Sequence, residues 1–196
     1  QKENSMLRNI LKEKEEMYDV LMKQMKVGNS IIGGNKELYF IADIGANHDG
    51  DIEVAKETIR AAKRAGADCI KLQTYTPDTI TIDSKKDDFI IKGTIWENKN
   101  LYELYKEAYT PWEWHEILFK TAEEEGLICF SSPFDKTAVD FLENLNTPAY
   151  KIASGDLTNT PLQEKIAKTG KPVLLSTGGG NFKDIERAVL PDAVGP

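Results

Sequence analysis

From residue 38 onward the sequence repeats one unit, in which a short apolar segment and a polar turn precede a helical segment. Apolar segments that predict strands lie at 39–44, 69–73, 127–131, 149–152 and 173–176. Helical patterns alternate with them and lie at about 52–65, 111–125, 137–144, 161–168 and 184–189. Strands that are apolar on both faces and alternate with helices predict a parallel sheet covered by helices. The predicted fold class is therefore α/β.

The position of the polar residues favours a barrel over an open, doubly wound sheet. Polar residues cluster just after each of the five strands, so every crossover contributes to one rim, as in a (β/α)8 TIM barrel. An open sheet would concentrate them at a single switch point. The turn after the first strand, residues 45–50, also lacks the Gly-x-Gly-x-x-Gly pattern of dinucleotide-binding folds. We expect a TIM barrel.

The length of the chain allows only part of that barrel. Eight units occupy about 250 residues, and the chain after residue 38 supplies about five. We expect a fragment of a longer barrel, with a loop at 191–196. Residues 1–24 carry apolar positions at helical spacing and predict an N-terminal helical extension, whereas Gly and Asn residues within 27–35 predict a β-hairpin. Residues 25–196 then form the partial TIM-barrel domain.

Composition excludes several classes of partner. The net charge is −7, and the basic residues are dispersed, which argues against nucleic acid. No apolar stretch reaches the roughly 18 residues of a membrane span, and the beginning of the sequence lacks the apolar core of a secretory signal. Cys69 and Cys129 lie in apolar runs, so we expect buried thiols rather than a disulfide, and a reducing cytoplasmic location.

Asp43 ends the first strand, and two histidines lie farther along the chain. A carboxylate at the carboxyl end of a barrel strand can act as a general acid or base or accept a hydroxyl. The alternative for Asp43 is a structural cap. His48 follows in the next turn, where a lone histidine is expected to orient the loop. His115 lies within a helix between aromatic residues and is expected to be a surface or packing residue.

Lys71 and Gln73 share one face of the second strand, because side chains alternate along a strand. A lysine within such a strand needs an anionic partner, which predicts a phosphate or carboxylate ligand. Two alternatives are a Schiff-base role and a salt bridge with an acid on a neighbouring strand.

The third and fourth strands add further groups at their carboxyl ends. Ser132 follows the third strand, and the fourth strand reads Lys151-Ile152-Ala153-Ser154-Gly155-Asp156. Two lysines and two serines on three neighbouring strand ends predict a composite anion site. After the fifth strand, 176–180 form a Gly-rich turn that either approaches a ligand closely or serves as a plain connection.

Five segments together resemble the sialic acid synthase family, which includes N-acetylneuraminate, legionaminate and pseudaminate synthases. They appear in order as Ile41–Gly50, Ile70–Thr74, Ser131–Phe134, Pro148–Asp156 and Gly170–Gly178. The resemblance implies a TIM barrel whose bottom is capped by the hairpin. It also implies that phosphoenolpyruvate condenses with an amino-sugar aldehyde of the N-acetylmannosamine type, giving a nonulosonic acid and phosphate.

The resemblance also implies a role for each candidate residue. Asp43 is the catalytic candidate, at a position where many members carry Glu, and its shorter side chain bears on which sugar is used. Gln73 and Asp156 are expected to contact the sugar. The phosphate and carboxylate of phosphoenolpyruvate are assigned to Lys71, Ser132, Lys151 and Ser154.

A divalent metal, manganese or magnesium, is implied as the Lewis acid on the aldehyde. In the family its two histidine ligands come from strands later than the fifth, so no residue of this chain is assigned to a metal site. The full-length protein is expected to be a homodimer. Two alternatives stay open at this point: a class I aldolase with its Schiff base on Lys71 or Lys151, and a non-catalytic, truncated binding fragment.

Overall fold

The computed structural model describes Lys12 and residues 23–189 of the 196-residue chain. The chain divides into two compact units, residues 1–39 and 40–196, and each is described by itself. The predicted helical extension at 1–24 falls almost entirely outside the described residues, as does the predicted loop at 191–196. Among the described residues, no helix is long and apolar enough to cross a membrane.

The first unit contains the predicted β-hairpin. Strands β1 (Gln24–Val27) and β2 (Ser30–Gly33) pair antiparallel, with Val27 opposite Ser30 across the two-residue turn. Gly33 has a φ of +92°, and a Cβ there would lie 2.5 Å from the carbonyl oxygen of Lys23. Only glycine fits this position. Gln24, the last residue of the range predicted as the helical extension, already belongs to β1.

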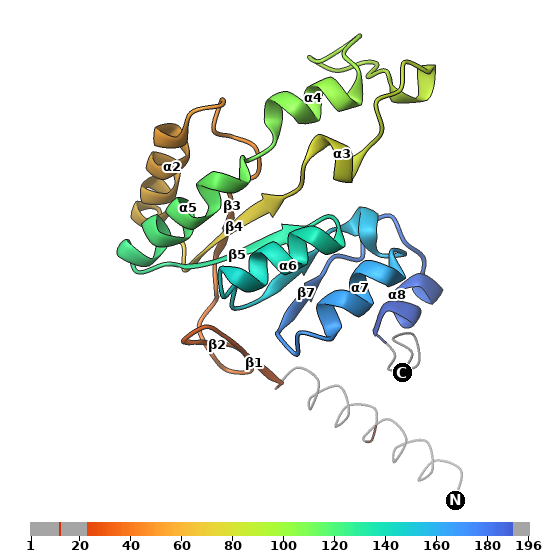
Figure 1. The fold of residues 1–196 in the computed structure, drawn as a ribbon. Helices are drawn as coiled ribbons and strands as arrows, with labels where there is room; N and C mark the ends of the chain where they lie inside the picture. Colours follow the sequence, from red (N-terminus) through yellow and green to blue (C-terminus); the bar gives the residue numbers. More distant parts are fainter. Residues whose placement is uncertain (1–11, 13–22, 190–196) are drawn as a thin grey trace, which may run out of the picture. The chain divides into compact units, whose positions relative to one another are not determined.

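The second unit is built on five parallel strands whose spatial order follows the sequence, as in a TIM barrel (Figure 1). They are β3 (Ile41–Asp43), β4 (Cys69–Thr74), β5 (Ile128–Pro133), β6 (Tyr150–Ile152) and β7 (Val173–Leu175). The crossover helices are α2 (Ile52–Arg64), α5 (Trp112–Glu124), α6 (Lys136–Asn144) and α7 (Thr160–Ala167), and α8 (Phe182–Val189) follows β7. The sheet is a curled half-barrel. The prediction of a partial (β/α)8 barrel is confirmed.

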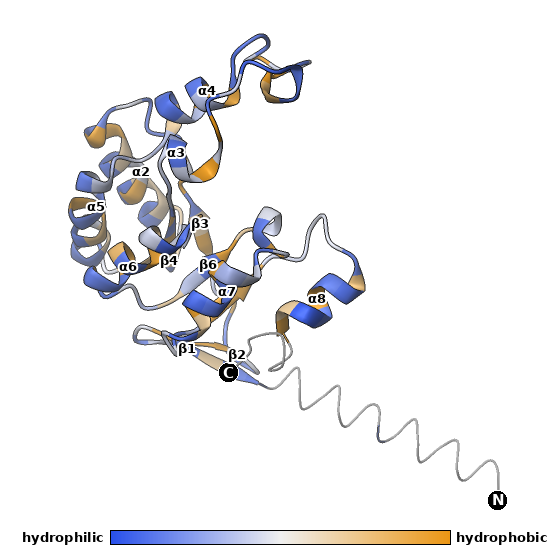
Figure 2. Ribbon diagram, turned by 45° about the vertical axis from the view of Figure 1, so that its right-hand side comes forward, coloured by the Kyte–Doolittle hydropathy of each residue, from blue (hydrophilic) through white to orange (hydrophobic). Residues whose placement is uncertain are grey.

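Two hydrophobic clusters join the helices to one face of this sheet. In the first, Ile70 and Leu72 of β4 pack with residues of α2 and α5, such as Ile59 and Leu118. In the second, β6 packs with α6 and α7, and the fully buried Tyr150 contributes its ring. Figure 2 shows hydrophobic and hydrophilic residues alternating along the helices, as expected where one side of a helix covers a sheet.

The alternation of side chains along the strands places polar residues on the opposite face. Because Ile70 and Leu72 of β4 point to the helices, Lys71 and Gln73 point away from them. The same argument places Lys151, next to the helix-facing Ile152, on the face without helices. This face is the one that lies inside a closed barrel.

The crossover between β4 and α5 contains elements that the sequence pattern did not predict. Residues 75–111 include α3 (Pro77–Ile80), a 3-10 helix at Asp87–Phe89 and α4 (Leu101–Ala108). An isolated antiparallel bridge between Ile90 and Asn100 folds the segment back on itself. An ion pair between Lys99 and Glu107 then attaches it to α4. We call residues 75–111 the excursion.

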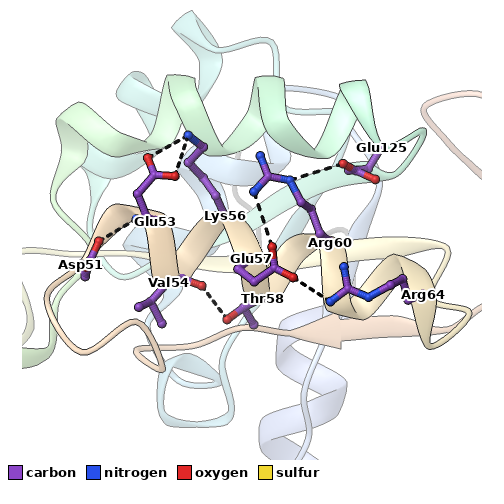
Figure 3. A network of polar contacts seen from close by, with 9 residues as sticks. All are labelled: Asp51, Glu53, Val54, Lys56, Glu57, Thr58, Arg60, Arg64 and Glu125. Atoms are coloured by element: carbon purple, nitrogen blue, oxygen red, sulfur yellow. Dashed lines mark hydrogen bonds and ion pairs between the residues drawn. The ribbon is translucent and has the colours of Figure 1, made fainter.

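Helix α2 carries a network of ion pairs on its outer surface (Figure 3). Asp51 caps the helix by accepting a hydrogen bond from the amide of Glu53 at 2.8 Å. Along the helix, Lys56 pairs with Glu53, Arg64 pairs with Glu57, and Arg60 reaches Glu125 after α5. Exposed pairs of this kind contribute about 1 kcal/mol or less each. We therefore interpret the network as an ordinary solvent-facing feature of the fold rather than as part of a functional site.

Candidate functional site

We use the name strand-end cluster for five predicted site residues that lie on the strands or just after them: Asp43, Lys71, Ser132, Lys151 and Ser154. Interactions join Asp43, Lys71 and Lys151, whereas Ser132 is placed by strand register and Ser154 lies in the loop after β6. The parallel register places Asp43 beside Lys71 and Gln73 beside Ser132. A carboxylate oxygen of Asp43 lies 2.8 Å from the Lys71 ammonium, whose side chain is only 13% exposed. The salt bridge that was one alternative role for Lys71 therefore exists, and the partner of Lys71 in it is Asp43, the catalytic candidate.

Lys151 lies close enough to this ion pair to interact with both of its members. Its ammonium donates hydrogen bonds to the carbonyl of Ile152 at 2.7 Å and to the hydroxyl of Ser176. Burial lowers the pKa of Lys151, the Lys71 ammonium lowers it further, and the Asp43 carboxylate opposes both effects. Two ammonium groups beside one carboxylate leave a net positive charge, which favours an anionic ligand.

The loops after β6 and β7 approach each other at the edge of the cluster. Ser154 begins a 3-10 helix (Ser154–Asp156) and is exposed. A Cβ built on Gly178 would lie 3.5 Å from the Cβ of Ser154 and 3.8 Å from its hydroxyl. The absence of a side chain at residue 178 thus leaves the Ser154 hydroxyl open on that side. The Gly-rich turn after β7 therefore lies close to Ser154, and its approach to a ligand stays a prediction.

Asp156 is held within its own loop. The side-chain amide of Asn159 donates a hydrogen bond to Asp156 Oδ1 at 3.0 Å. Burial raises the pKa of Asp156, and this hydrogen bond partly opposes the effect. Among the described residues, no contact joins its carboxylate to the strand-end cluster. Its predicted contact with the sugar stays a prediction.

A cavity of about 1050 Å³ lies beside the cluster. One wall is the loop from β3 to α2, and the other is the excursion. Its lining residues are Asp43, Gly45, Ala46, Asn47, Asp49, Gly50, Gln73, Tyr75, Trp96, Leu104, Tyr105, Glu107 and Ala108. Asp43 therefore belongs to both the cluster and the cavity. A volume of this size accommodates a small-molecule ligand.

Three polar side chains meet around Gly45 in the first wall of the cavity. A Cβ there would lie 3.7 Å from the amide nitrogen of Asn47 and 3.9 Å from both Asp43 Oδ1 and Gln73 Nε2. Gly45 has a φ of +55°, which side chains rarely adopt, and its amide donates to Asp43 Oδ1 at 3.2 Å. The absence of a side chain at this turn leaves a carboxylate and two amides facing the same space.

The excursion supplies an aromatic part of the wall. The rings of Tyr75 and Tyr105 meet edge to face, with centroids 5.6 Å apart, and Phe134 contacts Tyr75 in the same manner. Burial raises the pKa of Tyr75 to about 12. Trp96 keeps 46% of its surface exposed. Sequence reasoning missed Trp96, Tyr105 and Glu107, and a tryptophan within an otherwise polar stretch was the one available signal.

Both histidines are buried. His115 is fully buried on the helix-covered side, where Nε2 lies 2.9 Å from the hydroxyl of Thr74 and Nδ1 lies 3.1 Å from the carbonyl of Pro111. Burial lowers its pKa to about 4. Its packing role is confirmed, and the surface alternative was wrong. His48 orients its loop as expected, because Nδ1 accepts a hydrogen bond from the Gly50 amide.

Two further expectations concern sulfur and metals. Cys69 and Cys129 are both buried and are not joined in a disulfide, as predicted. Within residues 23–189, no three His, Cys, Asp or Glu side chains gather into a group that could hold a metal ion.

Comparisons with known proteins identify relatives of the chain as a whole. The pseudaminic acid synthase of Campylobacter jejuni serotype O:2 is 51% identical over 154 residues, which are 79% of this chain and 44% of that protein. The N,N'-diacetyllegionaminic acid synthase of Legionella pneumophila is 34% identical over 164 residues, covering 84% and 46% of the two chains. The chain thus spans less than half the length of these relatives.

A solved structure and a family model complete the comparison. The N-acetylneuraminic acid synthetase of Leptospira borgpetersenii, solved with citrate, superposes with a TM-score of 0.75 at 30% identity, covering 86% of this chain and 54% of that one. Residues 58–191 match the model of the NeuB family. The matched range contains Lys71, Ser132, Lys151 and Ser154 and begins after Asp43. The chain belongs to the NeuB family.

Proposed function

We propose that this chain is part of a nonulosonic acid synthase that condenses phosphoenolpyruvate with an amino-sugar aldehyde of the N-acetylmannosamine type. The observation that carries the proposal is a net positive charge on the strands, where Lys71 pairs with Asp43 and Lys151 interacts with both, beside a polar and aromatic cavity. Its relatives, which include pseudaminic acid and diacetyllegionaminic acid synthases, support the class of product.

In this proposal the strand-end cluster binds phosphoenolpyruvate. Lys71 and Lys151 supply two cations for the phosphate and carboxylate, and Ser132 and Ser154 supply hydroxyl donors. Ser132 is 2% exposed and lies in register with Gln73, so its hydroxyl is fixed by the sheet rather than by a loop. An anion that enters the cluster competes with Asp43 for Lys71, which releases the carboxylate toward the cavity.

The amino sugar occupies the cavity. Gln73 projects from β4 toward the first wall, and the neighbouring amide of Asn47 offers a second donor and acceptor to hydroxyl or acetamido groups. Aromatic rings from the excursion suit the apolar face of a sugar. We assign Asp156 to the sugar as well, on the resemblance alone.

The reaction then forms one carbon–carbon bond and one carbon–oxygen bond, the latter from water, and breaks the carbon–oxygen bond to phosphate. The enol carbon of phosphoenolpyruvate attacks the aldehyde carbon, and the aldehyde oxygen becomes a hydroxyl. Water adds to the adjoining carbon, and phosphate leaves with its bridging oxygen. Asp43 lies where the cluster meets the cavity, so its carboxylate is placed to accept the proton of that water.

A divalent metal, manganese or magnesium, stays part of the proposal and would polarise the aldehyde. Its ligands would lie outside this chain, and we derive no step through it. The homodimer, the small-molecule substrates and the cytoplasmic location expected from the sequence are likewise proposed for the full-length protein.

Phosphate release tests the proposed function directly. The full-length protein is incubated with phosphoenolpyruvate, manganese and either N-acetylmannosamine or a diacetamido hexose, and phosphate is measured over time. We expect release only when both substrates are present. Release without sugar, or no release with any amino sugar, would contradict the proposal.

The class I aldolase is the competing function, and the depressed pKa of Lys151 is the observation in its favour, because a less basic lysine forms Schiff bases more readily. The named synthase relatives do not favour it. Borohydride treatment in the presence of pyruvate decides between the two: we expect no covalent adduct on Lys71 or Lys151, and a trapped lysine would establish the aldolase.

A further inference from the structure

The two walls of the cavity are joined by a buried side chain that does not line it. His48 is 2% exposed and lies in the loop from β3 to α2, directly between the wall residues Asn47 and Asp49. Its Nε2 lies 3.3 Å from the hydroxyl of Thr110, which is also 2% exposed. Thr110 follows α4, two residues after Ala108 in the opposite wall. One contact therefore connects both walls.

The hydrogen-bond partners of His48 define its tautomer. A backbone amide can only donate, so the Gly50 amide, 3.2 Å from Nδ1, requires that Nδ1 be unprotonated. The neutral ring then carries its proton on Nε2 and donates it to the Thr110 hydroxyl. Burial lowers the pKa of His48, which favours this neutral form, although the Asp49 carboxylate opposes the shift.

The ring plane is also held in place. Trp114, in the first turn of α5, meets the His48 ring edge to face with centroids 5.3 Å apart. A ring held by a backbone amide on one side, a hydroxyl on the other and an indole against it has little rotational freedom. The distance between residue 48 and residue 110 is thereby fixed.

We propose that His48 is a positioning residue that sets the spacing of the two cavity walls, and so the fit of the amino sugar, through its hydrogen bond to Thr110. The inference rests on the proposed function for its ligand, whereas the tether itself rests on geometry alone. Losing one such hydrogen bond should weaken sugar binding by about two- to tenfold. The phosphoenolpyruvate site, which neither residue contacts, should be unaffected.

Two isosteric variants separate the two hydrogen bonds of the ring. His48→Gln places an amide nitrogen near the position of Nε2 and keeps the donor to Thr110, whereas His48→Asn places an acceptor near Nδ1 and keeps only the Gly50 bond. In the full-length enzyme we expect His48→Asn to raise the amino-sugar KM by about two- to tenfold, with the phosphoenolpyruvate KM within twofold of wild type. His48→Gln should restore most of the sugar KM.

Thr110 provides the matched pair for a double-mutant cycle. Thr110→Val removes the acceptor and should reproduce the His48→Asn effect, Thr110→Ser should not, and the double variant should lose no more than either single one. Additive losses, or equal changes in both KM values, would overturn the proposal.

A second readout does not depend on activity. Nitrogen-15 spectra of the imidazole should show Nε2 protonated and Nδ1 unprotonated in the wild type, and unfolding measurements should show coupling between residues 48 and 110. If the enzyme releases no phosphate, the proposed function fails, while these measurements still decide the tether. The opposite tautomer or zero coupling would overturn it.

Discussion

The strand-end cluster and the cavity share Asp43 but are built in different ways. Four of the five cluster residues, Asp43, Lys71, Ser132 and Lys151, lie within strands, where hydrogen-bonded register fixes each position. The cavity walls are the loop from β3 to α2 and the excursion, which are joined to each other through the hydrogen bond between His48 and Thr110. Under the proposed function, the cluster binds phosphoenolpyruvate and the cavity selects the sugar.

Asp43→Asn tests the residue that the two regions share. The change keeps an acceptor for the Gly45 amide but removes the charge that pairs with Lys71. We expect turnover to fall by roughly a hundredfold or more, as is common for a general acid or base. Because the Asp43 side chain is 52% exposed, stability should change by about 1 kcal/mol or less. Steady-state kinetics and urea unfolding provide both values.

Wild-type turnover of this variant across the pH range would make Asp43 a structural cap. A loss of stability large enough to explain the loss of turnover would also make Asp43 a structural residue.

His115 supports β4 from the helix-covered side through a hydrogen bond to Thr74, which adjoins Gln73. The Thr74 hydroxyl also forms a hydrogen bond with the hydroxyl of Ser131, which adjoins Ser132. Its pKa falls from 6.5 to about 4 on folding. Above pH 6.5 the ring is neutral in both states and the full stability is present. As the pH falls toward 4, only the unfolded chain gains the proton, so about 3 kcal/mol of stability is lost.

Urea unfolding of the chain at a series of pH values between 7.5 and 4 measures this loss. His115→Gln removes the titrating group, and its stability should depend on pH less than that of the wild type by about this amount. An unchanged pH dependence would show that His115 does not titrate in this range.

Gln73 and Ser132 are neighbours in register, but Gln73 lines the cavity whereas Ser132 belongs to the strand-end cluster. Gln73→Ala should raise the amino-sugar KM by about two- to tenfold and leave the phosphoenolpyruvate KM within twofold. Ser132→Ala should do the reverse. The magnitude is that of one hydrogen bond. If both variants change the same KM, the two regions do not bind different substrates.

The difference between the strands and the excursion also separates what the sequence could predict from what it could not. The strands and their site residues were predicted because side chains alternate with a period of two, so Lys71 and Gln73 had to share a face once the strand was recognised. The parallel order of five strands then placed their carboxyl ends together. The ion pair between Asp43 and Lys71 is a consequence of that register.

The excursion escaped prediction for a physical reason. Its elements α3 and α4 are four and eight residues long, too short to be stable helices alone, and they form through contacts within the segment. The contacts of Lys99 with Glu107 and of Asn100 with Ser84 join residues 8 and 16 positions apart in the sequence. No periodicity in the sequence encodes such contacts, so the structure was needed to place Trp96 and Tyr105 in the cavity wall.

The binding of phosphoenolpyruvate to a Lys151→Ala variant tests the central claim most directly. Lys171→Ala is the matched control, because this partly buried lysine pairs with Glu143, which lies on α6. Calorimetric titration of the full-length protein should show the dissociation constant of Lys151→Ala weakened roughly ten- to a hundredfold, the value of one charge-assisted contact. Lys171→Ala should stay within twofold of wild type. A Lys151→Ala constant within twofold of wild type would contradict the assignment of the strand-end cluster to phosphoenolpyruvate.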